Sequence, residues 1–147
     1  MRFYHFIKSA LLSVFAKRTI GVRMLLLKDD QVLLVKHTYQ SGWYTIGGGV
    51  ERRETPRFAI ERELQEEVGV RLANPPELFS VYYSYHEKHD NYVMFYIGRF
   101  HSQTPVQSPE IAESRWFPIQ NLPEDTTPAT RRRIEEYLGA RPISELW

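Results

Sequence analysis

The sequence has no cysteine among its 147 residues. This absence excludes a disulfide framework, a thiolate metal site and a cysteine nucleophile, and it suits the reducing cytoplasm, where we expect the protein to reside. The chain also has no apolar run close to the roughly 20 residues that span a bilayer, and it has no internal repeat. A net charge of +1 gives no general reason to expect a polyanionic partner.

The remaining composition is that of an ordinary globular protein. Hydrophobic residues make up 42% of the chain and charged residues 25%. The length suits one domain with a single hydrophobic core. We expect an amphipathic segment over residues 1–18 and the principal domain over residues 19–147.

The N-terminal segment has apolar side chains at helical spacing and several cations but no acid. The apolar positions are Phe3, Phe6, Ile7, Ala10, Leu11, Val14 and Phe15. Three interpretations are open: a helix packed on its own domain or on a second subunit in a homodimer, a peripheral helix on an anionic membrane surface, and a signal peptide. Lys8 interrupts the apolar stretch and argues against the signal peptide.

The rest of the chain alternates strand and helix signals. Two β-rich apolar runs flank "KDDQ" and predict a hairpin over residues 20–37. The glycine-rich segment 38–49 is expected to be a loop. Further strands are expected over residues 78–85, 92–100 and 114–118.

Two helices are expected in this domain. The first runs over residues 56–68, because Thr55 can cap it, Pro56 suits its first position and Gly69 ends it. The second follows Thr127 and stops at Gly139. A long helix between groups of strands indicates a mixed α/β fold whose sheet packs against helices.

Three carboxylates are crowded on the first of these helices. At about 100° per residue, Glu63, Glu66 and Glu67 share one arc of its surface. Like charges three and four residues apart are unfavourable by ~0.2–0.5 kcal/mol each, and a divalent cation reverses that sign. Magnesium prefers such hard oxygen ligands, together with waters and substrate phosphates. On the helix alone, solvated glutamates of a good helix former explain the pattern equally well.

The longer string from Gly48 to Val70 decides between these explanations. Gly48, five residues, Glu54, seven residues and then "RELQEEVGV" fit the pattern G-x5-E-x7-R-E-U-x-E-E-x-G-U at every specified position, where U is aliphatic. This string resembles the Nudix box. The resemblance implies a Nudix-type α/β/α sandwich with a mixed central sheet, here with an extra N-terminal helix. It also implies Mg²⁺- or Mn²⁺-dependent hydrolysis within the diphosphate of a nucleoside diphosphate linked to another moiety.

The resemblance also assigns roles to single residues. The implied metal ligands are Glu63, Glu66, Glu67 and the carbonyl of Gly48, and the implied supporting salt bridge joins Glu54 to Arg62. Members of this family differ in the general base, which is either a glutamate of the box or one on a later loop. The candidates here are Glu66 and Glu67 in the box and, in "SPEIAESRWFP", Glu110 first and Glu113 second.

Substrate contacts are expected outside the acidic cluster. Tyr39, Trp43 and Tyr44 carry rings that can stack on a base, and a second aromatic group spans residues 82–92, where strand tyrosines can equally face the core. Arg52 and Arg53 precede the N-terminus of a helix, where anions are already favoured. Ile46 stands where the family often carries proline, so the path of the glycine loop stays open.

Two functional classes remain in view. The first is a pyrophosphohydrolase acting on a small-molecule nucleotide such as ADP-ribose, a nucleotide sugar, a dinucleoside polyphosphate or a nucleoside triphosphate. A capped RNA is also compatible, although the lack of a basic stripe disfavours long nucleic acid. The second is a Nudix-fold sensor or scaffold that binds nucleotides without cleaving them. An isopentenyl diphosphate isomerase is disfavoured, because that activity resembles one needing a cysteine.

Overall fold

The computed structural model describes residues 18–147. The expected N-terminal helix, and with it the homodimer or membrane contact through residues 1–17, lies outside the described residues. Within the described part of the chain, no helix is long and apolar enough to cross a membrane.

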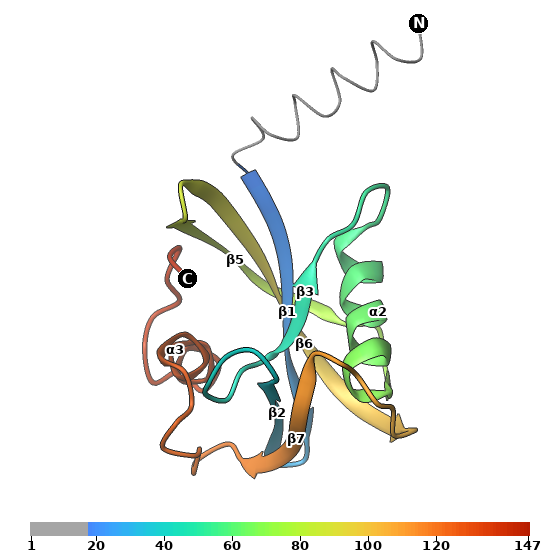
Figure 1. Cartoon of the computed structure of the whole chain (residues 1–147). Helices are drawn as coiled ribbons and strands as arrows, with labels where there is room; N and C mark the ends of the chain where they lie inside the picture. The colour runs from blue at the N-terminus through green and yellow to red at the C-terminus, as the bar shows by residue number, and fades with distance from the viewer. Residues whose placement is uncertain (1–17) are drawn as a thin grey trace, which may run out of the picture.

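A mixed sheet of seven strands separates the two helices of residues 18–147 (Figure 1). The strands are β1 (Arg18–Lys28), β2 (Gln31–His37), β3 (Ile46–Gly49), β4 (Val70–Leu72), β5 (Glu77–His86), β6 (His89–Gln103) and β7 (Ile111–Pro118), and the helices are α2 (Pro56–Val68) and α3 (Pro128–Tyr137). The main strand order is β4-β6-β1-β2-β7, while β3 pairs with β1 and β5 with β6. The predicted α/β class with a mixed central sheet between helices is therefore confirmed.

Strand β1 lies at the centre of the sheet and divides the core in two. It runs parallel to β6 over ten residue pairs, and its side chains alternate between the two faces of the sheet. Val22, Met24 and Leu26 pack with α2, whereas Leu25 and Leu27 pack on the face of α3. These five side chains are at most 2% exposed, so each contributes roughly 1.5–3 kcal/mol through burial. The alternation thereby fixes both helices against the sheet.

Both predicted helices are confirmed, and their ends have the expected caps. The Thr55 hydroxyl accepts a hydrogen bond from the Phe58 N–H at 3.2 Å, and Gly69 ends α2 in the left-handed region at φ 65°. Helix α3 follows the Thr127 cap and ends at Tyr137, two residues before Gly139, whose φ is 74°. Such local signals fix the start and the end of a helix without help from distant parts of the chain.

The expectation of an uninterrupted loop over residues 38–49 is wrong, because Ile46–Gly49 forms β3. Its glycines pair with Gly21, Val22 and Arg23 of β1. A Cβ on Gly47 would lie 2.0 Å from the Val22 carbonyl oxygen, so only glycine permits this approach of the two strands. The fully buried Ile46, at the position of the family's proline, pairs with Met24.

Candidate active site

The acidic residues of α2 share one cavity with a distant loop. The cavity has a volume of about 440 Å³, and its lining residues are Glu51, Arg62, Glu63, Glu66, Glu67, Gln107, Ser108, Pro109 and Glu110. We call it the acidic cavity. Glu63 and Glu67 are buried and Glu66 is exposed. The three carboxylates that were predicted to crowd together therefore line the same cavity.

The glycines of β3 let two of these carboxylates approach the backbone closely. A Cβ on Gly48 would lie 2.3 Å from Oε1 of Glu63, so the absence of a side chain makes room for the carboxylate. The N–H of Gly47 donates a hydrogen bond to Oε2 of Glu67 at 3.3 Å. The backbone of β3 and the side chains of α2 therefore lie against one another.

Arg62 links the start of α2 to the loop before it. Its Nε and Nη2 donate to the two carboxylate oxygens of Glu54 at 2.7 and 3.0 Å, and Nη2 also donates to the Gly49 carbonyl at 3.0 Å. Hydrogen bonds from Arg62 and from the Glu51 N–H lower the pKa of Glu54, and the bond to Glu54 raises the pKa of Arg62. The predicted pair is a bidentate ion pair, the geometry that fixes position as well as charge.

Burial raises the pKa of both inner carboxylates. It raises the pKa of Glu67 to about 7, with the charge of Glu63 as the second cause. Burial also raises the pKa of Glu63, while the hydrogen bond from Arg62 acts in the opposite direction. A charged group that is costly to bury in this way becomes favourable when a cation joins it.

The donor set of this site fits a divalent metal ion. Glu63, Glu66, Glu67 and the Gly48 carbonyl are hard oxygen donors, and glycine at position 48 leaves space beside the Glu63 carboxylate. Among residues 18–147, no three acidic or imidazole side chains converge as a metal-holding group. Instead, Nη1 of Arg62 donates to both Glu63, at 2.9 Å, and Glu66, at 3.2 Å. A metal ion would replace these two contacts, while the bonds from Arg62 to Glu54 need not change.

The two later acids lie in different surroundings. Glu110 lines the acidic cavity, and its charge contributes to the raised pKa of Glu67. Its main chain is held to the end of β2, because the Glu110 carbonyl accepts the Thr38 N–H at 2.9 Å. Glu113 pairs with Arg115 on β7 and lines a neighbouring cavity whose wall also includes Glu67. Of the two, Glu110 is the one that shares a cavity with Glu63, Glu66 and Glu67.

The residues predicted to contact substrate fall into three groups. Tyr39 is 66% exposed, and Tyr44 is half-buried with its ring 4.9 Å from that of His37. Trp43 is only 3% exposed and packs on Phe117 in the core below α3, so its ring offers no face for stacking and we remove it from the substrate site.

The two arginines form the third group. Arg52 and Arg53 are exposed in the turn before α2, where Arg53 has a left-handed φ of 65°. Their contact with phosphate stays a prediction.

Two further residues beside the site escaped sequence reasoning. Arg23 of β1 carries a buried Nη1 that has no hydrogen-bond partner within residues 18–147, and its charge lowers the pKa of Glu67 and of His37. His37 is 8% exposed at the end of β2, and burial is the main cause of its lowered pKa. A signal existed for Arg23, since it is the single charge in the apolar run of residues 20–27.

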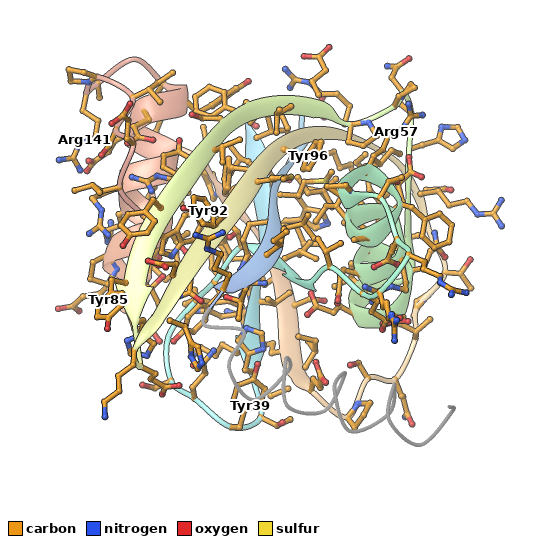
Figure 2. All side chains as sticks on the ribbon, turned by 90° about the horizontal axis from the view of Figure 1, so that it is seen from above. Tyr39, Arg57, Tyr85, Tyr92, Tyr96 and Arg141 are labelled. Carbon is orange, nitrogen blue, oxygen red and sulfur yellow. The ribbon has the colours of Figure 1, made fainter. Side chains whose placement is uncertain are left out.

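A second, aromatic cavity lies on the other side of β3. It measures about 580 Å³ and is lined by Thr19, Ile20, Gly21, Arg23, Gly48, Gly49, Ser84, Tyr85, His86, Asn91, Tyr92, Val93 and Trp147. Figure 2 shows Tyr85 and Tyr92 on the β5–β6 hairpin, away from α2. Gly48 lines this cavity and also lies against Glu63, so the aromatic cavity adjoins the acidic residues of α2.

Comparison with known proteins gives the family to which this fold and this acidic cavity belong. The family model for the NUDIX domain matches residues 17–138. The chain therefore belongs to the Nudix hydrolase family, whose enzymes are pyrophosphohydrolases.

Individual relatives agree with this assignment. The chain is 32% identical over 114 residues to a protein of Shigella dysenteriae named NAD-capped RNA hydrolase NudC, covering 74% of this chain and 43% of that one. A protein of the same name from Stutzerimonas stutzeri is 32% identical over 124 residues, covering 80% and 44%. The chain thus spans less than half the length of these relatives.

Solved structures agree in fold. A MutT NUDIX hydrolase from Burkholderia pseudomallei superposes with a TM-score of 0.71 at 25% identity, covering 80% of this chain and 96% of that chain. A NUDIX hydrolase from Nitrosomonas europaea gives a TM-score of 0.73 at 22% identity, with 84% and 90% covered. At that lower identity, the likeness bears on the fold alone.

Proposed function

We propose that the chain hydrolyses, with Mg²⁺ or Mn²⁺, the diphosphate linkage of a small nucleoside diphosphate derivative, and that residues 19–147 form the catalytic domain. The observation that carries this proposal is the acidic cavity, in which Glu63 and Glu67 lie beside the backbone of β3 and Glu66 lines the same space. Burial of carboxylates with raised pKa values gives the cavity its affinity for a cation.

Each part of the site has a proposed role. The metal ion would be held by Glu63, Glu66, Glu67 and the Gly48 carbonyl, and when bound it supplies charge neutralisation of the diphosphate and a lower pKa for the attacking water. A carboxylate within reach must accept the proton of that water. The candidates are Glu66, Glu67 and Glu110, which line the cavity. Glu54 and Arg62 hold the loop against α2.

Substrate binding is proposed for the residues on the other side of β3. Arg23 lies at the inner end of the aromatic cavity, where its cation suits a phosphate. Tyr39 and Tyr44 are placed near Glu110 and Arg23. A dinucleotide such as NAD is compatible with the relatives' names. We rank a long capped RNA lower, because the chain has a net charge of +1 and no basic stripe.

A substrate panel tests the proposal. Native protein is assayed with Mg²⁺ against ADP-ribose, NAD, UDP-glucose, a dinucleoside polyphosphate, an oxidised nucleoside triphosphate and a short NAD-capped RNA. The best substrate is then repeated with Glu67→Gln, for which we expect a loss of kcat of about 100-fold or more. Glu61→Gln is the matched control, because Glu61 lies on the same helix but pairs with Arg57 and lines another cavity.

The outcomes separate the two functional classes. Full turnover by Glu67→Gln contradicts the role assigned to that residue. Tight binding of a nucleotide with Mg²⁺ and no hydrolysis of any panel member favours the sensor or scaffold.

A further inference from the structure

Trp147 is shared by two cavities on the α3 side of the sheet. It lines the aromatic cavity with Tyr85 and Tyr92. It also lines a neighbouring cavity of about 410 Å³, whose other walls are Arg23, Tyr44, Thr45 and the first turn of α3 with Arg132. Because Arg23 and Trp147 are common to both cavities, the indole stands beside any ligand that extends from Gly48 toward α3.

The main chain around Trp147 is fixed to the edge of β5. The Glu145 carbonyl accepts the Tyr83 N–H at 2.7 Å, and the Trp147 N–H donates to the Tyr83 carbonyl at 2.9 Å. Leu146 forms a parallel bridge with Tyr83. Figure 1 shows this part of the chain next to β5 and α3. The segment 144–147 is therefore held as an added strand-like edge.

A buried ion pair on α3 holds the same segment from behind. Arg133 and Glu136 have fully buried side chains 2.8 Å apart. Oε1 of Glu136 accepts the Ser144 N–H at 3.1 Å, and Nη1 of Arg133 donates to the Leu146 carbonyl at 3.1 Å. These two bonds tie the segment 144–147 to the buried pair of α3.

The indole itself is partly buried, and it packs against Tyr82, Phe95 and Arg133 at the edge of the core. Its ring lies 5.7 Å from that of Tyr82 at 72°, and the Arg133 guanidinium is 5.2 Å from its centroid. These contacts fix the orientation of the ring while part of it faces the two cavities. An aromatic ring held in advance loses little side-chain entropy when a ligand stacks on it.

We infer that Trp147 is a specificity-determining residue whose indole stacks on the nucleobase of the substrate in the aromatic cavity. This inference rests on the proposed function. It means that the segment 144–147 recognises the half of the substrate that carries the base. Stacking of a base on an aromatic side chain is worth about 1–3 kcal/mol and tolerates different bases. The segment therefore selects nucleotides over diphosphates that lack a planar group.

Two probes distinguish stacking from a structural role. α,β-Methylene-ADP carries a base and a diphosphate that cannot be cleaved at its P–C–P linkage, and methylene diphosphonate carries the same linkage without a base. Calorimetry with Mg²⁺ compares native protein with Trp147→Ala, Trp147→Phe and Leu146→Ala. Leu146 is the matched control, since it belongs to the same segment and its side chain is 61% exposed.

We expect Trp147→Ala to weaken binding of α,β-methylene-ADP by about tenfold or more and to leave binding of methylene diphosphonate unchanged. Trp147→Phe should keep most of the affinity, and Leu146→Ala all of it. α,β-Methylene-ADP should also quench the tryptophan fluorescence of native protein more than that of Trp147→Phe.

Contrary results are equally distinct. Equal affinity of native protein and Trp147→Ala for α,β-methylene-ADP overturns the inference. Parallel loss of both probes in Trp147→Ala also overturns it, because it reports damage to the fold. Native protein that binds neither probe contradicts the proposed function itself and removes the basis of the inference.

Discussion

At the residue scale, Glu67 is the carboxylate of the acidic cavity whose surroundings differ most from water. Its side chain is 4% exposed, and burial raises its pKa to about 7. One hydrogen bond, from the Gly47 N–H, offsets part of the cost of burying its charge. The residue therefore couples the stability of the metal-free protein to pH.

The pKa of Glu67 gives the sign of that coupling. Because the folded pKa of about 7 exceeds the ordinary glutamate value of 4.5, the folded state binds the proton more tightly than the unfolded state. The contribution to stability is complete below about pH 4.5, declines as pH rises and is lost above about pH 7. Its full size is on the order of 3 kcal/mol.

Urea unfolding with EDTA between pH 5 and 8 measures this effect. The free energy of unfolding of native protein should fall with pH relative to that of Glu67→Gln, which has no carboxylate to ionise at this position. A difference between the two proteins that stays constant over this range would contradict the account.

The two later acids provide a matched pair. Glu110 lines the acidic cavity, whereas Glu113 pairs with Arg115. We expect Glu110→Gln to lower kcat about 10- to 100-fold at unchanged KM, as the loss of a proton acceptor does, and Glu113→Gln to stay within about twofold of native protein. Steady-state kinetics on the best panel substrate measures both. Equal effects of the two substitutions would count against Glu110.

At the element scale, the proposed metal site depends on strand β3, which carries the Gly48 carbonyl beside Glu63. Gly48→Ala places a Cβ 2.3 Å from the Glu63 carboxylate. That carboxylate is the end of a flexible side chain, so it can turn away without unfolding the protein. We expect nearly unchanged thermal stability and an affinity for Mn²⁺ that is about tenfold lower or worse.

Gly49→Ala is the control for this substitution. A Cβ at Gly49 meets no atom within 4 Å, so both the stability and the Mn²⁺ affinity should match those of native protein. Thermal unfolding measures the stability of each variant, and titration with Mn²⁺ measures its affinity for the metal. Equal Mn²⁺ affinities of Gly48→Ala and Gly49→Ala would exclude the proposed ligand geometry.

The same elements show what the sequence could and could not predict. Helix α2 was predictable to the residue, because Thr55, Pro56 and Gly69 act locally. Strand β3 was not, because glycine disfavours strands and its pairing depends on the close approach of Val22 across the sheet. Strand β4 has only three residues, too few to show a period.

At the scale of the whole molecule, local sequence patterns do not predict which distant segments pair with each other. β1 pairs in parallel with β6, some 70 residues later, rather than chiefly with its neighbour β2. Arg23 of β1 lies on the α3 face, where it lines two cavities. Likewise, Trp43 was expected at the substrate, yet packing against Phe117 makes it a core residue.

The buried pair of α3 contributes to the stability of the whole molecule. Glu136→Ala leaves Arg133 buried without its partner, and we expect a loss of about 3–5 kcal/mol in the free energy of unfolding. Arg141→Ala removes an exposed ion pair with Glu135 at 3.1 Å and should cost no more than about 1 kcal/mol. Urea denaturation measures both, and similar losses would contradict the structural role given to Glu136.

The central claim is that the carboxylates of α2 and the backbone of β3 take up a divalent cation together. Calorimetric titration of the metal-free protein with Mn²⁺, in the presence of α,β-methylene-ADP, tests it most directly. We expect saturable uptake that Glu67→Gln weakens at least about tenfold and that Glu61→Gln leaves unchanged. No uptake by native protein, or equal uptake by the two variants, would contradict it.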